Sequence, residues 1–131
     1  MWLITPIGFF SIVQKPSDRE ANTLTIRARV RADLEALRDN HLPHLGDIQE
    51  SRHNDYRFRA VAPRQEVATA MANMIETLDY PNFKSQVAKV QGAARAWEVT
   101  GDPRWRRIVY AYWRSGVTER GYYITGGQTN G

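Results

Sequence analysis

Cysteine is absent from this chain of 131 residues. Its absence excludes disulfide bonds, thiolate zinc sites, iron–sulfur clusters and a cysteine nucleophile. A small secreted scaffold that depends on disulfides is excluded for the same reason. The sequence therefore indicates a cytoplasmic protein whose fold is stabilised by an ordinary hydrophobic core.

Long apolar runs are also missing, since no segment approaches the roughly 20 apolar residues that a membrane-spanning helix needs. Residues 1–13 are apolar, but Pro6 and Gly8 interrupt them. No basic leader precedes this segment and no small-residue cleavage site follows it. We therefore expect a buried strand here, no signal peptide and no membrane partner.

Recognised catalytic motifs are the third absence. The chain has no Gly-x-Ser-x-Gly motif. Gly126-Gly127 lacks the lysine and the following helix of a phosphate-binding loop. Glu66 and Glu76 lie too far apart on one helix to share a proton. We assign no catalytic residue, cofactor or metal site, and the sequence favours a non-enzymatic protein without deciding the question.

What the chain does contain is typical of a folded domain. Hydrophobic residues make up 42% of the sequence and charged residues 24%, which are ordinary values for a globular protein. The 18 lysines and arginines exceed the 14 acids, which gives a net charge of +4. Arginine dominates this excess, so its placement matters more than the sum.

The apolar pattern predicts four strands. Residues 24–31 and 56–62 alternate apolar and basic side chains, which is typical of half-buried strands. Residues 8–14 are aromatic and β-branched with little alternation, which predicts a central strand. A short strand is expected at 47–51.

Helical spacing fills the rest of the chain. We predict one helix at 32–40, a second beginning at Pro63 and a third capped by Asn82. The resulting order, ββαββα, predicts an α+β fold with a four-stranded antiparallel, ferredoxin-like sheet and helices on one face. This domain spans residues 1–92, and residues 93–131 form a helical appendage with a terminal Tyr-Ile-Thr-Gly-Gly turn.

Several motifs in residues 1–92 are familiar. They are Met1-Trp2-Leu3, the run from Gly8 to Lys15, the run from Leu24 to Leu34, Asp55-Tyr56-Arg57-Phe58-Arg59-Ala60 and Asp79-Tyr80-Pro81-Asn82-Phe83-Lys84. On these motifs the segment resembles a family of small, uncharacterised bacterial proteins. The resemblance implies no activity.

The C-terminal segment has a different resemblance. Its motifs are the run from Glu98 to Trp105, Tyr112-Trp113 and the run from Tyr122 to Gly127. They resemble a short stretch, about 35 residues, of the family 127 glycoside hydrolases, which are β-L-arabinofuranosidases on an α/α barrel. That family uses a cysteine nucleophile in a zinc site, and this chain has no cysteine. Hydrolysis by that route is therefore excluded.

Four arginines form the most specific candidate site. By strand alternation Arg27, Arg29, Arg57 and Arg59 project from the open face of the sheet, and Arg31 extends the patch. Guanidinium groups bind phosphate bidentately, so an anion or a nucleic acid is one interpretation. A protein partner that covers the face is another. The third is that these arginines are outward residues that pair with acids.

The aromatic residues bear on the nucleic-acid interpretation. Open-sheet readers of single-stranded RNA stack bases on aromatic side chains. By parity Tyr56 and Phe58 lie with the aliphatic residues, so only Phe9 or Phe10 is expected to supply such a ring.

Other candidate sites have plain explanations. His41, His44 and His53 lack metal-ligand spacing, which predicts solvated loop side chains. The segment 79–84 is interpreted as a turn with an asparagine cap, with a recognition loop as the alternative. The tryptophans of the appendage are interpreted as packing anchors rather than a sugar platform; they are Trp97, Trp105 and Trp113.

The leading hypothesis is a small binding protein that uses the arginine-rich open face, either on a partner or by dimerising across it. One alternative is a fragment or relative of the glycoside hydrolases without catalytic residues. Another is an assembly subunit that docks through its C-terminal helix, because exposed aromatic patches usually mark interfaces.

Overall fold

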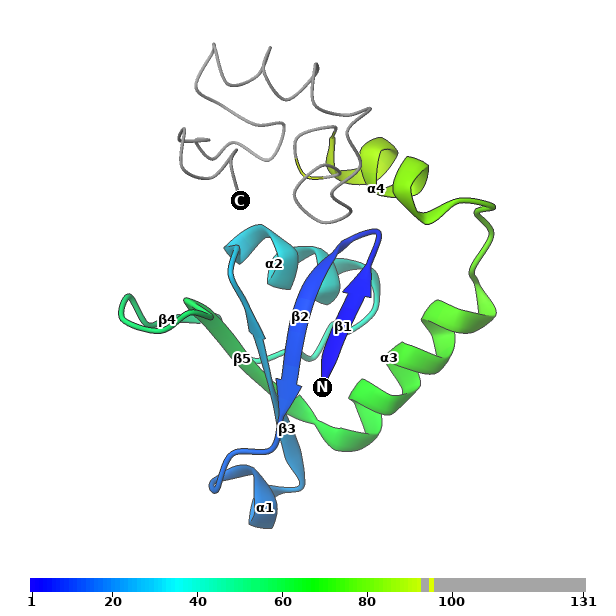
Figure 1. Ribbon diagram of the computed structural model, residues 1–131. Helices are drawn as coiled ribbons and strands as arrows, with labels where there is room; N and C mark the ends of the chain where they lie inside the picture. Colours follow the sequence, from blue (N-terminus) through cyan, green and yellow to red (C-terminus); the bar gives the residue numbers. More distant parts are fainter. Residues whose placement is uncertain (93–94, 96–131) are drawn as a thin grey trace. The chain divides into compact units, whose positions relative to one another are not determined.

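The computed structural model of the chain describes residues 1–92 and Arg95. The chain divides into two units, Met1–Asp79 and Tyr80–Gly131. The first unit is an α+β domain with an antiparallel sheet (Figure 1). In the second unit the structure describes one helix, α4 (Phe83–Gln91).

The sheet contains five strands in the described residues, in the order β1-β2-β3-β5-β4. Every neighbouring pair is antiparallel. The strands are β1 (Trp2–Thr5), β2 (Gly8–Val13), β3 (Thr23–Ala28), β4 (Gln49–Glu50) and β5 (Phe58–Pro63). The α+β class and the antiparallel sheet predicted from the sequence are thus confirmed.

The predicted number of strands is wrong, because the apolar N-terminal segment forms two strands instead of one. A tight turn at Pro6 and Ile7 reverses the chain between β1 and β2. The Thr5 hydroxyl holds this turn by accepting from the Gly8 amide at 3.2 Å and donating to the Gly8 carbonyl at 3.0 Å. The ferredoxin-like pattern is not confirmed, since β1 and β2 form a hairpin at one edge of the sheet.

Two helices cover one face of the sheet. They are α2 (Arg31–Asn40) and α3 (Arg64–Glu76), and a short helix α1 (Asp18–Ala21) lies in the connection between β2 and β3. Apolar side chains of α2, α3 and the sheet form a single core. Its buried residues are Phe10, Ile12, Ile26, Ala28, Leu34, Leu37, Leu42, Leu45, Ala60, Ala62, Val67 and Ala70.

Gly8 permits the close contact between β2 and α2. A Cβ atom at this position would lie 2.8 Å from Cβ and Cγ of Asp33 and 2.9 Å from Cζ of Phe10. The Asp33 side chain is fully buried, and its Oδ2 accepts a hydrogen bond from the Phe9 amide at 3.2 Å. The first turn of α2 is therefore fixed against the start of β2.

The predicted helix boundaries agree with the structure where it describes them. Helix α2 begins at Arg31, one residue before the prediction, and α3 directly follows Pro63. Asn82 caps α4 as predicted, since its side chain accepts a hydrogen bond from the Ser85 amide at 3.0 Å. No helix in the described part of the chain is long and apolar enough to span a bilayer.

The predicted appendage lies outside the described residues, apart from Arg95. This applies to the helical structure predicted for residues 93–131, to the three tryptophans at positions 97, 105 and 113, and to the terminal Tyr-Ile-Thr-Gly-Gly turn.

Candidate binding face

The face of the sheet opposite α2 and α3 carries polar and aromatic side chains in register. Trp2 pairs with Ser11, Ser11 with Arg27, and Arg27 with Arg59. Paired residues of antiparallel strands project to the same face, so these four side chains form one row across four strands. We call this surface the open face. It comprises Trp2, Ile4, Phe9, Ser11, Arg27, Arg29, Arg59 and, from the segment before β5, Tyr56.

Aromatic rings support two arginines of the open face. The Cζ atom of Arg27 lies 4.6 Å from the centre of the Tyr56 ring. The Cζ atom of Arg29 lies 5.5 Å from the same ring and 5.4 Å from the centre of Phe9. A guanidinium group over an aromatic face is stabilised by the ring quadrupole and keeps its N–H edge free to bind.

The row extends to the edge strand through a second aromatic contact. Trp2 and Phe9 meet edge to face, with ring centres 5.6 Å apart and planes at 60°. Trp2 is 66% exposed, which is unusual for so large a ring. Ile4, on the same strand and face, is 49% exposed. The β1 end of the open face is therefore apolar and accessible.

The alternation predicted for Tyr56 and Arg57 is wrong. Tyr56 lies against Arg27 and Arg29 on the open face. Arg57 donates a hydrogen bond from Nε to Oε1 of Glu50 at 2.8 Å, and its Nη2 forms an ion pair with the same oxygen at 2.7 Å. Because β5 begins only at Phe58, these two residues belong to the β4–β5 loop, where strand alternation no longer sets the direction of a side chain.

Arg57 therefore separates from the other three arginines of the predicted site. The Ser51 amide donates to the Arg57 carbonyl at 2.7 Å, which closes the loop between β4 and β5. The hydrogen bond from Arg57 and the nearby charges of Arg57 and Arg52 lower the pKa of Glu50. The charge of Arg57 is thus matched by a carboxylate.

Arg27, Arg29 and Arg59 differ from Arg57. Within the described residues, none of the three forms an ion pair with a carboxylate. Arg27 donates from Nη2 to the Ser11 hydroxyl at 2.8 Å, and Arg59 donates to the Tyr56 carbonyl at 3.2 Å. The Nε atoms of Arg27 and Arg59 are buried, and neither has a hydrogen-bond partner among the residues that the structure describes.

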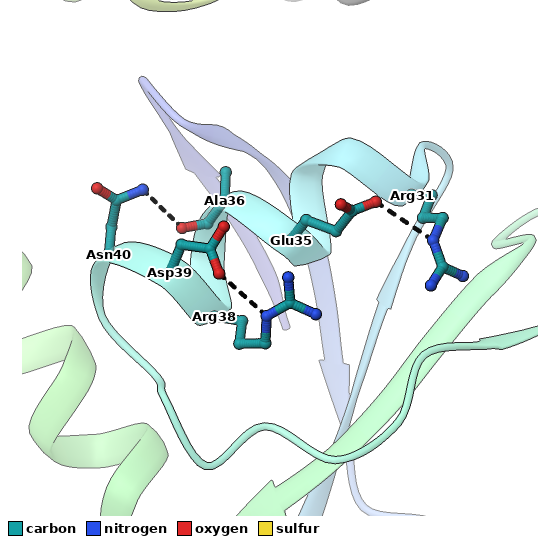
Figure 2. Close-up of polar contacts among 6 residues, drawn as sticks. All are labelled: Arg31, Glu35, Ala36, Arg38, Asp39 and Asn40. Carbon is teal, nitrogen blue, oxygen red and sulfur yellow. Dashed lines mark hydrogen bonds and ion pairs between the residues drawn. The ribbon is translucent and has the colours of Figure 1, made fainter.

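The arginines of α2 show the opposite arrangement. Figure 2 shows Arg31 directed at Glu35, with Nε 3.2 Å from the carboxylate, and Arg38 beside Asp39 at 3.0 Å. Arg31 therefore does not extend the patch, contrary to the sequence prediction. Pairing with acids explains Arg31, Arg38 and Arg57, but not the three arginines of the open face.

The carboxylate of Asp18, in α1 beside the start of β3, is held by hydrogen bonds from its neighbours. Asp18 is 2% exposed and accepts hydrogen bonds from the hydroxyls of Thr23 and Thr25, at 2.6 and 2.8 Å. It also accepts from the Lys15 amide at 2.7 Å. Burial raises the pKa of Asp18, but these three hydrogen bonds and the charge of Arg64 outweigh it and lower the pKa below its ordinary value of 3.8.

The histidines do not converge. Nδ1 of His44 lies 2.8 Å from Oε1 of Glu66, which joins the loop after α2 to α3. Burial lowers the pKa of His41 and so favours its neutral form. His53 is exposed in the β4–β5 loop. No group of three or more metal-ligating side chains occurs among the residues described.

The chain was compared with protein-family models, with curated proteins and with solved structures. None of the three comparisons gave a match. The two resemblances predicted from sequence motifs therefore stay predictions, and the function is argued from the open face.

Proposed function

We propose that this protein binds an anionic ligand through the open face of its sheet. The observation that carries the proposal is the set of three guanidinium groups, Arg27, Arg29 and Arg59, which lie on one face without a carboxylate partner in the described part of the chain. Unmatched positive charges on neighbouring strands repel one another. An anion that bridges them removes this repulsion.

The surroundings of the three arginines favour binding. Tyr56 and Phe9 hold the guanidinium groups of Arg27 and Arg29 in place, so little side-chain freedom is lost when a ligand binds. A guanidinium group carries its N–H donors in a fixed fork that matches phosphate and carboxylate oxygens. Arg27 and Arg59 each use one Nη2 donor within the protein, so the ligand is bound by the remaining Nη donors.

The proposal is tested with inorganic polyphosphate and isothermal titration calorimetry on the full chain. The test variant is Arg29→Gln/Arg59→Gln. The matched control is Arg31→Gln/Arg38→Gln, which removes the same charge from the ion-paired arginines of α2 (Figure 2). Since a charged hydrogen bond contributes about 1.5–3 kcal/mol, we expect the test variant to bind at least tenfold more weakly and the control to stay within twofold of the wild type.

Thermal unfolding of both variants is measured in parallel, and we expect both to unfold within a few degrees of the wild type. Equal weakening by the test and control variants would show that net charge alone attracts the anion. No binding by the wild type at low salt would refute the proposal.

A further inference from the structure

We infer that the anion bound by the open face is a single-stranded nucleic acid; this inference rests on the proposed function. Its observation is the position of an exposed aromatic ring in line with Arg27 and Arg59, which form no ion pair within the described residues. Trp2 is 66% exposed and stands in the same cross-strand row as Arg27 and Arg59. Single strands present both phosphates and unstacked bases. The bases match the Trp2 end of the row, and the phosphates match the arginine end.

The dimensions of the row suit an extended strand. Trp2 lies on β1 and Arg59 on β5, three strand positions apart in the sheet. At about 4.8 Å per strand, the row is roughly 14 Å long. A nucleic-acid strand that crosses the sheet from β1 to β5 places a base on the Trp2 ring and its following phosphates over Arg27, Arg29 and Arg59.

The aromatic end distinguishes this ligand from other anions. Polyphosphate or a sulfated polymer contacts the arginines but has no ring to stack on Trp2 or Phe9. A duplex keeps its bases within its own stack, so they are withheld from Trp2. Base–aromatic stacking is independent of sequence, since every base has a π face.

The contacts around Trp2 assign separate roles to its neighbours. Phe9 meets Trp2 edge to face and so fixes the orientation of the ring. Phe9 also contacts Arg29, whose Cζ lies 5.4 Å from the centre of the Phe9 ring. Phe9 thus joins the stacking residue to a phosphate-binding residue. It is a positioning residue for both.

The inference is tested by fluorescence anisotropy with three labelled probes and the full chain. The probes are oligothymidylate of about 12 nucleotides, within the site sizes of single-strand binders, an abasic oligonucleotide of the same length, and polyphosphate. We expect the wild type to bind oligothymidylate about tenfold more tightly than the abasic strand, because one stacked base contributes a factor of this order. With three phosphate contacts, the slope of log K against log salt is expected near −2.

Variants of Trp2 separate stacking from charge. Trp2→Ala is expected to lose about tenfold in affinity for oligothymidylate and nothing for the abasic strand or polyphosphate. Trp2→Tyr retains a stacking ring and is expected to stay near the wild type. Ile75→Ala is the matched control, since Ile75 is 73% exposed on α3, away from the open face.

The outcomes distinguish the two proposals. If polyphosphate and all oligonucleotides bind equally and Trp2→Ala changes nothing, the nucleic-acid inference is wrong and anion binding stands. Tighter binding of polyphosphate than of oligothymidylate would also overturn the inference, because the ligand would then be recognised by charge without stacking. If no anion binds, both proposals fail.

Discussion

The two faces of the sheet have different environments, and successive residues of one strand lie on opposite faces. Phe9 and Phe10 are neighbours in β2 and have opposite environments. Phe10 is fully buried among the side chains of the core. Phe9 lies on the open face between Trp2 and Arg29. The covered face packs apolar side chains against α2 and α3, whereas the open face combines aromatic rings with arginines that form no ion pair in the described part of the chain.

This difference separates stability from binding. Burial of apolar surface stabilises the fold, so the covered face is where substitutions should unfold the domain. The open face holds three arginines without matching acids in the described residues, an arrangement that contributes little to stability. Substitutions there should change ligand affinity more than unfolding.

The largest expected effect on stability is that of Phe10→Ala. It removes a fully buried ring from the centre of the core and should lower the free energy of unfolding by about 4 kcal/mol. Phe9→Ala, one residue away, loses mainly its contacts with Trp2 and Arg29 and should cost about 1–2 kcal/mol. Urea unfolding followed by circular dichroism checks both. Equal losses would break the distinction between the two faces.

The second effect concerns Asp18. Asp18→Asn weakens hydrogen bonds from Thr23, Thr25 and the Lys15 amide and should cost about 2 kcal/mol at pH 7. Because the folded pKa is lowered, this stability is present above the unfolded pKa of 3.8 and is lost as the pH falls through the folded pKa. Wild-type stability should therefore fall more steeply with acid than that of the variant. Parallel acid curves would contradict the role of Asp18.

The third effect tests the ring beneath Arg27. A double-mutant cycle of Arg27→Gln and Tyr56→Leu should give a coupling energy of about 1 kcal/mol, because the guanidinium group lies 4.6 Å from the ring centre. Urea unfolding of the two single variants and the double variant supplies the cycle. Additive effects would show that Tyr56 does not hold Arg27 in place.

The smallest effect is expected on α2. Arg31→Gln removes an exposed ion pair with Glu35, which contributes about 0.3–0.5 kcal/mol. Arg31 also lies in the first turn of the helix, where a positive charge opposes the helix dipole. The net change in unfolding free energy should therefore be close to zero, with no change in anion affinity. A large loss of affinity would place part of the binding site on α2.

Strand alternation predicted much of the fold and part of the site. Arg27 and Arg59 lie directly opposite each other, as the period-two pattern of their segments implies. The extra strand β1 is not predicted by the sequence pattern, because residues 1–13 form one apolar segment in it. In the structure Pro6 lies in the turn of a hairpin.

Alternation failed where the strand ends. It assigned Tyr56 to the core and Arg57 to the open face, whereas Tyr56 lies on the open face and Arg57 pairs with Glu50 in the β4–β5 loop. β5 begins only at Phe58, which pairs with Ala28 of β3 and Glu50 of β4, and a local sequence pattern does not contain these pairings. The alternation pattern also could not predict the ion pair between Glu50 and Arg57, because the closure of the β4–β5 loop brings these two residues together.

The most direct measurement of the central claim observes the arginine side chains themselves. Nitrogen-15 NMR of the Nε–H groups is recorded on the full chain during titration with oligothymidylate. Binding at the open face predicts that the signals of Arg27, Arg29 and Arg59 shift with ligand concentration. The signals of Arg31, Arg38 and Arg57, which are held by carboxylates, should stay in place. Shifts confined to this second group, or none at all, would contradict the account.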